Sequence, residues 1–193
     1  SYSVTVHAGD INAVYGGARI ADVNGSTFVH IDGERASDYI VINKVYGGND
    51  IAGTIGTSAT LPAALTKTAE NKISDNWNAF VRISTKTTTT GEGAGAKVEE
   101  TADAQKIYIG QLFGGGNGDY DYTSDDSPYK GKNKPELGKT YLELLGGSIV
   151  YAYGGGNCAT VTDSTVIFLD NPSKVVNSIV DAKNPNADNN GEV

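Results

Sequence analysis

The chain of 193 residues contains a single cysteine, Cys158, and no methionine. One cysteine excludes an intrachain disulfide, so the core must be held by packing and hydrogen bonds. We expect Cys158 to be a small buried residue, because free cysteines are often buried. Without methionine there is no initiator residue, and we therefore expect the chain to be a piece of a longer precursor.

Basic residues and long apolar runs are also scarce. The 15 Lys and Arg residues are outnumbered by 23 Asp and Glu residues, which gives a formal net charge of −8. This sign of charge opposes binding to nucleic acid or to an anionic membrane. No apolar run approaches the roughly 18 residues of a membrane-spanning helix. The sequence therefore predicts no nucleic-acid partner and no membrane span.

Glycine is abundant, with 25 residues, and much of it recurs in one motif. An aromatic residue followed by two or three glycines occurs four times, and the glycine pairs are Gly16 and Gly17, Gly47 and Gly48, Gly114 and Gly115, and Gly154 and Gly155. The first glycines, at positions 16, 47, 114 and 154, are 31, 67 and 40 residues apart. Repetition at such spacings is typical of solenoids, propellers and arrays.

The segments around the first and last copies share one order of short extended runs. Residues 11–15 and 149–153 precede the glycines, and a turn then leads to further runs at 26–31 and 164–169. Three short strands in about 20–30 residues indicate a parallel β-helix, in which successive coils stack. We expect one all-β domain over residues 1–170, followed by a polar linker or disordered tail at 171–193.

Three insertions are expected to leave this repeat through its turns. The first, at 57–76, is predicted to contain a short helix, because Leu61, Leu65, Ala69 and Ile73 recur at a spacing of four. The second, at 85–105, is expected to be an exposed loop or extended arm. The third, at 120–139, is polar and leads back into a strand at 140–144.

The aromatic residues of the motif are the first candidate site. If the coils superpose, Tyr15, Tyr46, Phe113 and Tyr153 form a ladder with a rung about every 4.8 Å. The ladder could be an exposed stripe for sugar rings or another protein, or an internal stack that fills the domain. Lys44 and Gln111, two residues before two of the aromatics, favour the exposed stripe, whereas Phe113 favours shelter.

The second candidate is an acidic run that follows the third glycine motif. Asp119, Asp121 and Asp125 could supply oxygen ligands to calcium, a hard cation. The alternative is a solvated loop, since the run occurs once and departs by one position from the glycine-rich calcium repeat. No other cofactor is expected.

Catalysis is not favoured. Polysaccharide hydrolysis requires carboxylates that converge on one face, but outside the loops the sequence contains no cluster of Asp and Glu. It has two histidines and three arginines, and no nucleophile-elbow or phosphate-loop pattern. We expect the protein not to be an enzyme.

The repeated motif, as in Tyr153, Gly154, Gly155, Gly156 and Asn157, resembles the glycine-rich β-helical repeats of adhesin-like and autotransporter-like surface proteins of gut bacteria. The resemblance implies a right-handed parallel β-helix (β-solenoid) of the broad pectin-lyase-like architecture, located outside the cell or on its surface. It implies a structural or adhesive module that binds glycans or host protein, or acts as a stalk. The alternatives are a carbohydrate-active enzyme of the β-helix kind and a spacer or filament subunit that assembles end to end.

Overall fold

A computed structural model describes residues 1–34, 39–56, 77–90, 97–100 and 106–169. All helix and strand assignments within these ranges are β-strands, so the predicted all-β class is confirmed there. No helix in the described ranges is long and apolar enough to cross a membrane. The helix predicted within 57–76 and the tail predicted at 171–193 lie outside the described residues.

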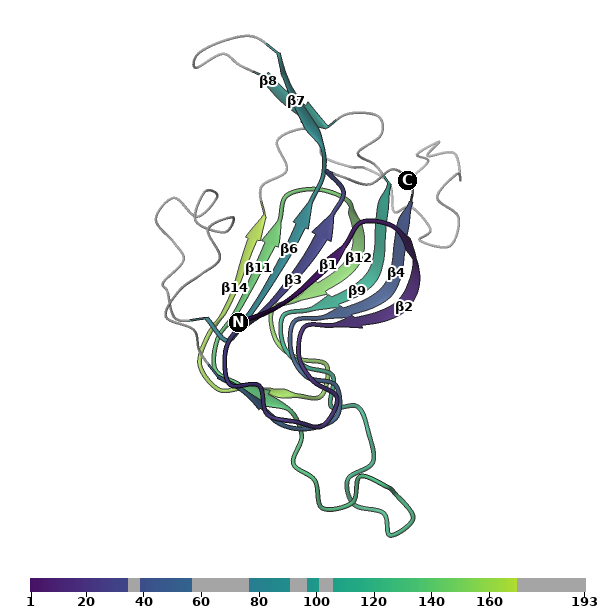
Figure 1. Ribbon diagram of the computed structural model, residues 1–193, viewed down its shortest axis with the longest axis vertical. Helices are drawn as coiled ribbons and strands as arrows, with labels where there is room; N and C mark the ends of the chain where they lie inside the picture. The colour runs from purple at the N-terminus through teal and green to yellow at the C-terminus, as the bar shows by residue number, and fades with distance from the viewer. Residues whose placement is uncertain (35–38, 57–76, 91–96, 101–105, 170–193) are drawn as a thin grey trace.

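The strands form three parallel sheets and one hairpin (Figure 1). Sheet A contains, in spatial order, β1 (Tyr2–Val6), β3 (Thr27–Asp32), β6 (Ala79–Ser84), β11 (Thr140–Leu144) and β14 (Thr165–Leu169). Sheet B contains β2 (Gly9–Tyr15), β4 (Ile40–Tyr46), β9 (Ile107–Phe113) and β12 (Ser148–Tyr153). Sheet C contains β5 (Thr54–Ile55), β10 (Glu136–Leu137) and β13 (Thr160–Val161), and Val23 bridges to Ile55 at its edge.

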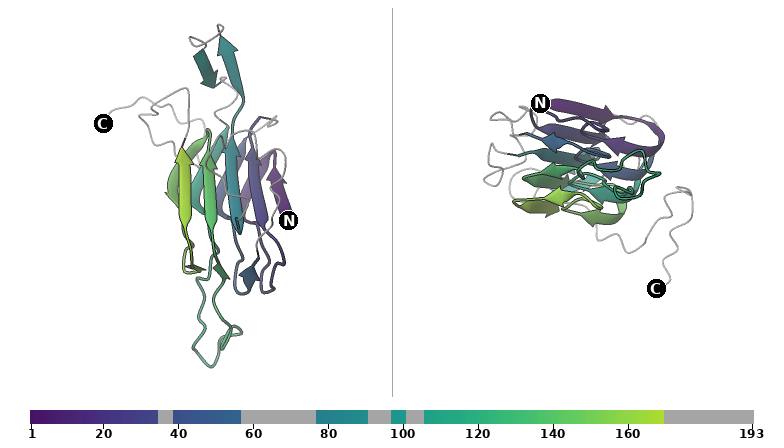
Figure 2. Two further views of the ribbon diagram at one scale, coloured as in Figure 1. Left: turned by 90° about the vertical axis from the view of Figure 1, so that its left-hand side faces the viewer. Right: turned by 90° about the horizontal axis from the view of Figure 1, so that it is seen from below.

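The chain visits sheets A, B and C in this order and then returns to sheet A. We call one such pass a layer. Layer 1 contains β1 and β2, layer 2 contains β3 to β5, layer 3 contains β6, β9 and β10, layer 4 contains β11 to β13, and β14 follows layer 4. The views in Figure 2 show the strands of successive layers lying side by side in each sheet.

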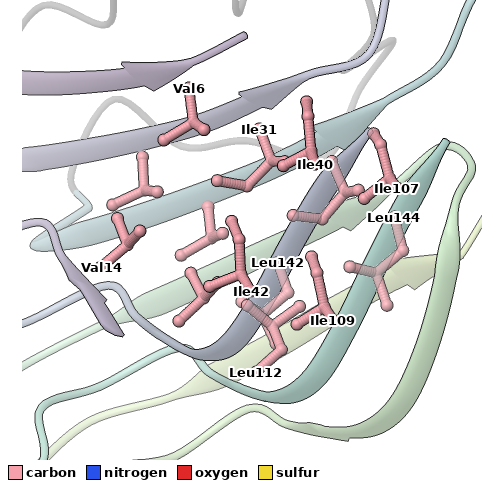
Figure 3. Close-up of a cluster of buried hydrophobic side chains, with 14 residues drawn as sticks. Val6, Val14, Ile31, Ile40, Ile42, Ile107, Ile109, Leu112, Leu142 and Leu144 are labelled. Carbon is pink, nitrogen blue, oxygen red and sulfur yellow. The ribbon is translucent and has the colours of Figure 1, made fainter. Parts of the chain in front are cut away.

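The core lies between sheets A and B and is built from rows of aliphatic residues (Figure 3). Val29, Val81 and Leu142 are register partners on sheet A, while Ile42 and Ile109 are partners on sheet B, and all five are fully buried. β-Branched residues suit this pleated and crowded surface. Each buried side chain contributes roughly 1.5–3 kcal/mol of hydrophobic stabilisation.

Two of the predicted insertions fall partly or wholly within the described residues. The segment expected to be a loop or arm contains the antiparallel hairpin of β7 (Thr87–Thr90) and β8 (Lys97–Glu100). The polar segment between β9 and β10 projects away from the sheets, opposite the hairpin (Figure 1). We call residues 118–135 the projecting loop. The strand predicted to follow it, at 140–144, is confirmed as β11.

Candidate functional site

The aromatic residues of the glycine motif stack into a continuous ladder at the ends of the sheet B strands. Tyr15, Tyr46, Phe113 and Tyr153 are register partners, because β2, β4, β9 and β12 pair without slippage at this end. Successive ring centroids are 4.9, 5.1 and 4.9 Å apart, and the planes differ by 7°, 8° and 14°. The spacing follows the separation of neighbouring strands, so the backbone register sets the stack.

Burial differs along the ladder. Tyr46 and Phe113 are 1% and 5% exposed, whereas Tyr153, in layer 4, is 45% exposed. Of the two alternatives left by the sequence, the internal stack applies to the two central rings and the exposed surface applies to Tyr153. Lys44 and Gln111, which favoured the exposed stripe, are themselves only partly exposed, whereas the aromatic residues next to them in the ladder are buried.

A buried carboxylate, Asp50, lies beside the ladder. It accepts hydrogen bonds from Asn117 Nδ2 at 2.9 Å and from the Tyr120 hydroxyl at 2.7 Å, and it also accepts one from Tyr15. The guanidinium Nε of Arg19 lies 4.0 Å from its Oδ2. Two side chains from layer 1 and two from layer 3 thus converge on one carboxylate, which compensates for its burial.

Burial and the nearby carboxylates raise the pKa values of the tyrosines in the ladder and beside it. Desolvation, assisted by the charges of Asp119 and Asp50, raises the pKa of Tyr46 to about 12. Desolvation and the Asp50 hydrogen bond raise the pKa of Tyr120 to about 12. Desolvation also raises the pKa of Tyr15, and the charge of Asp50 and the hydrogen bond to it raise this pKa further. These hydroxyls therefore remain protonated at neutral pH, and those of Tyr15 and Tyr120 donate hydrogen bonds to Asp50.

The first glycine of each of the first three motif copies is required by the close approach of the next layer. A Cβ atom on Gly16, Gly47 or Gly114 would lie 2.3 Å from the carbonyl oxygen of the first glycine in the following layer. The same glycines donate backbone hydrogen bonds to that layer, for example from Gly47 N to the Phe113 carbonyl oxygen at 2.9 Å. The motif is therefore a backbone contact between layers, and its glycines do not form a loop around a phosphate.

Asparagines after the glycines form a second ladder, to which the sequence analysis assigned no role. The side-chain oxygen of Asn49 accepts from Ala18 N at 2.7 Å, and its amide donates to the carbonyl oxygens of Ala21 and Ala52. In the later layers, Asn157 Nδ2 donates to Asn117 Oδ1 at 3.1 Å. The recurrence of Asn after the glycines was the sequence signal for this ladder.

The three aspartates of the acidic run have different partners. Asp121 accepts from Thr123 N and Ser124 N at 2.9 and 3.0 Å, and these hydrogen bonds lower its pKa. Asp125 pairs with Lys130, and Asp119 lies 3.8 Å from the Cys158 sulfur. In the part of the chain that the structure describes, no three His, Cys, Asp or Glu side chains are grouped so as to hold a metal ion. Calcium binding stays a prediction.

Cys158 itself is exposed, so the expectation that it is buried was wrong. It lies in layer 4, where no following layer within the described ranges covers it. Burial of this position would require a neighbour on the open side of the layer.

The outer face of sheet A carries a buried cluster that the sequence analysis did not predict. It is formed by Phe28, Trp77, Phe80 and Tyr141, with Val166 and Phe168 packed against it. In the next row of the same face, Arg82 Nε donates to Glu143 Oε2 at 2.5 Å. Glu143 is 0% exposed, and its Oε1 has no hydrogen-bond partner among the described residues. The inner strands β3, β6 and β11 of sheet A are thus buried on both faces, which the sequence analysis did not predict.

Two histidines lie at the ends of the sheet A strands. His30 Nε2 is 2.8 Å from the Ser84 hydroxyl, and His7 Nδ1 is 3.3 Å from Asp32 Oδ2. A serine next to a histidine is one part of a nucleophilic site. Ser84, however, is 2% exposed, so its hydroxyl is closed to a substrate in this conformation.

A polar cleft lies between the projecting loop and the turns that lead into sheet C. It has a volume of about 510 Å³ and is lined by Ile20, Asp22, Thr54, Lys132, Lys134 and Glu136, among others. Asp22 accepts from Thr54 N at 2.8 Å, and this hydrogen bond lowers the pKa of its carboxyl group. The cleft therefore offers charges of both signs and one exposed apolar side chain, Ile20.

Comparisons with protein-family models, with curated proteins and with solved structures find no match to this chain.

Proposed function

We propose that the chain is a structural β-solenoid module, a short right-handed parallel β-helix that acts as a stalk in an extracellular or surface protein of bacteria. The observation that carries the proposal is the repeated contact between layers. The aromatic ring, the following glycine and the backbone hydrogen bond recur in register from layer 1 to layer 4. A right-handed path is expected, because crossover connections between parallel strands are right-handed in almost all proteins.

The buried position of the motif supports a structural role for it. Its central aromatics are buried, and the first glycines of its first three copies lie against backbone of the next layer. Each added layer extends the rows of stacked aromatics and glycines, so the module becomes longer while its layers stay packed against one another. The resemblance of the motif to glycine-rich β-helical repeats supports a location on the bacterial cell surface.

The projecting loop and its cleft support a second function, adhesion to a glycan or to a host protein. The loop extends beyond the sheets, and its exposed Lys132 and Lys134 lie in the same cleft as Asp22 and Glu136. Positively and negatively charged side chains next to an exposed apolar residue suit the hydroxyls and ring faces of a sugar. Adhesion through this cleft would leave the stacked layers undisturbed.

The test of adhesion is retention of the purified protein on immobilised plant, bacterial and mucin glycans, with and without calcium. We expect retention to fall in the Lys132→Ala/Lys134→Ala variant and to persist in Lys86→Ala, an exposed lysine outside the cleft. Equal retention of both variants would contradict binding by the cleft. Release of sugar into the supernatant would favour the carbohydrate-active enzyme instead.

The stalk role is tested by the resistance of the protein to mechanical unfolding between two handle domains. We expect Gly47→Ala to lower the unfolding force, because its Cβ would meet the carbonyl oxygen of Gly114 in layer 3. An unchanged force in this variant would contradict load transfer through the layer contacts.

A further inference from the structure

The polar cleft beside the projecting loop is formed by residues of three layers. Thr54 of layer 2 lies between Asp22 and Glu136, because its backbone nitrogen donates to Asp22 and its Cα is paired in register with Glu136. Lys132 and Lys134 of the projecting loop line the same cleft. Two carboxylates and two ammonium groups therefore surround a volume of about 510 Å³, which is within the range of small-ligand sites.

The lysines of the cleft have no counter-ion within the described part of the chain. Lys130 and Lys139, which flank them in the sequence, each pair with an aspartate. By contrast, no carboxylate of the described residues lies within ion-pair distance of Lys132 or Lys134. The same residues also donate no hydrogen bond to the Glu136 side chain. These charged groups are therefore available to a ligand.

Asp22 keeps one carboxylate oxygen for a ligand. Its Oδ1 accepts from the backbone nitrogen and the hydroxyl of Thr54, at 2.8 and 3.1 Å. These hydrogen bonds lower the pKa of the carboxyl group, so it is ionised at neutral pH. No described residue donates to Oδ2. This second oxygen is therefore an acceptor for a ligand hydroxyl.

The projecting loop is fixed against the neighbouring layers by contacts on both sides of the cleft. The Tyr122 hydroxyl donates to the Ile51 carbonyl oxygen at 2.6 Å, and the Lys134 ammonium group lies 5.7 Å from the centre of the Tyr122 ring. On the other side, Arg19 Nη2 donates to the Tyr129 hydroxyl at 3.2 Å. The loop is thus held in place before a ligand arrives, and such preorganisation lowers the entropic cost of binding.

We propose that this cleft binds a carboxylated sugar, with its carboxylate at Lys132 and Lys134 and its hydroxyls at Asp22 and Glu136. The proposal rests on the adhesive function proposed above for the same cleft, and it names the class of ligand. A neutral sugar can donate to the two carboxylates but leaves both ammonium groups without a counter-ion. Charge-assisted hydrogen bonds are roughly twice as strong as neutral ones, so the two lysines select a carboxylate. Ile20, which is exposed, offers an apolar contact for the sugar ring.

The balance of charge in the cleft favours a ligand group with one negative charge. A phosphate monoester carries about −1.5 to −2 at neutral pH and would be repelled more strongly by Asp22 and Glu136. The net charge of −8 also opposes a long polyanion. Charges farther away than about 8 Å are largely screened at physiological ionic strength, so the local groups govern the binding of one carboxylated sugar.

The first experiment compares matched ligands by titration calorimetry with the full chain. Sialyllactose and a hyaluronan tetrasaccharide supply the carboxylate on a sialic acid and on a uronic acid, and the methyl ester of each is its neutral control. We expect at least one acid to bind at least about tenfold more tightly than its ester, because the ester carries no charge for the lysines. The acid that binds identifies the source of the carboxylate. Equal affinity of acid and ester in both pairs would overturn the proposed ligand class.

Charge-changing variants test whether the cleft makes this contact. Lys132→Gln/Lys134→Gln should lose the preference for the acid over its ester. The matched control, Lys44→Gln/Lys86→Gln, removes the same charge outside the cleft and should keep the preference. Both variants should retain the wild-type unfolding midpoint, because all four lysines are at least partly exposed. An equal loss of preference in the two variants would overturn the proposal, since overall charge would then explain it.

Failure of this proposal is distinguishable from failure of adhesion itself. No binding of either acid, together with retention of the protein on neutral glycans, would overturn the carboxylated ligand and leave adhesion standing. No binding of either acid and no retention on any glycan would overturn both. Raising the salt concentration from about 0.05 to about 0.5 M should weaken binding of the acid severalfold and leave that of the ester nearly unchanged. An acid whose affinity does not respond to salt would contradict the pairing with the lysines.

Discussion

The same motif has different surroundings in layer 2 and in layer 4. In layer 2, Tyr46 is 1% exposed and a Cβ atom on Gly48 would lie 2.8 Å from Gly116 N, whereas in layer 4 Tyr153 is 45% exposed and the equivalent Gly155 faces open space among the described residues. The local sequences are nearly identical, so the difference comes from the number of neighbouring layers. In a stacked array, the contribution of a residue depends on whether both neighbours are present.

The largest expected effect on this comparison comes from the aromatic ladder. Tyr46→Ala should lower the free energy of unfolding by about 4 kcal/mol, because it leaves a cavity between two stacked rings. Tyr153→Ala should lower it by about 1 kcal/mol, since that ring stacks on one ladder neighbour, Phe113, and is 45% exposed. Urea unfolding of both variants measures the difference, and equal losses would contradict the distinction between inner and terminal layers.

The buried ion pair on sheet A tests the same distinction between inner and exposed positions. Glu143→Ala should lower the free energy of unfolding by about 3 kcal/mol, because Arg82 would lose its 2.5 Å partner. The double variant Arg82→Met/Glu143→Leu should recover much of this loss, since no unpaired charge remains buried. Asp125→Ala, which removes the exposed pair with Lys130, is the control and should leave urea unfolding unchanged.

Two glycine substitutions compare backbone packing in an inner layer with that in layer 4. Gly47→Ala should lower the free energy of unfolding by about 3 kcal/mol, because its Cβ would overlap the Gly114 carbonyl oxygen. Gly155→Ala should change the stability of the monomer by no more than about 0.5 kcal/mol. Both are measured by urea unfolding at low protein concentration, and a large loss in Gly155→Ala would reveal an intrachain contact at the end of the stack.

The smallest expected effect is on the pH dependence of stability. The pKa of Tyr46 is about 12 in the folded protein and lies near 10 in an unfolded chain, so the unfolded state loses its proton first. The stabilisation is therefore fully present below pH 10 and is lost as the pH rises from 10 toward 12. Tyr46→Phe should flatten this fall in unfolding midpoints measured from pH 9 to 12, and Phe113 shows that phenylalanine fits the ladder. An unchanged pH profile in Tyr46→Phe would contradict this assignment.

The first copy of the motif is incomplete in sequence, yet it forms a layer like the others. Gly17 is followed by Ala18 and Arg19 rather than by a third glycine and asparagine, yet its layer pairs in register with layer 2. The missing features are supplied across the interface between layers, because Asn49 accepts the hydrogen bond from Ala18 N. A motif can therefore be incomplete in one layer when its neighbour provides the missing group.

The all-β class, the strand order around each glycine motif and the residues of the aromatic ladder could be predicted from the sequence. These features arise from local geometry, since strand propensity and the need for glycine at a close backbone approach are written into short segments. The predicted strands at 11–15, 149–153 and 164–169 accordingly agree with β2, β12 and β14.

Only the tertiary structure decided which of these residues are buried. The outer face of sheet A, the Arg82–Glu143 pair and the Asp50 cluster join residues that are far apart in the sequence. Phe28 and Phe80 are 52 positions apart, Arg82 and Glu143 are 61 apart, and Asp50 and Tyr120 are 70 apart. Burial depends on what lies above and below a layer, and neither neighbour is specified by the residues of the layer itself. For this reason Cys158 and Tyr153, at the open end of the stack, are exposed although their local sequence matches that of buried positions.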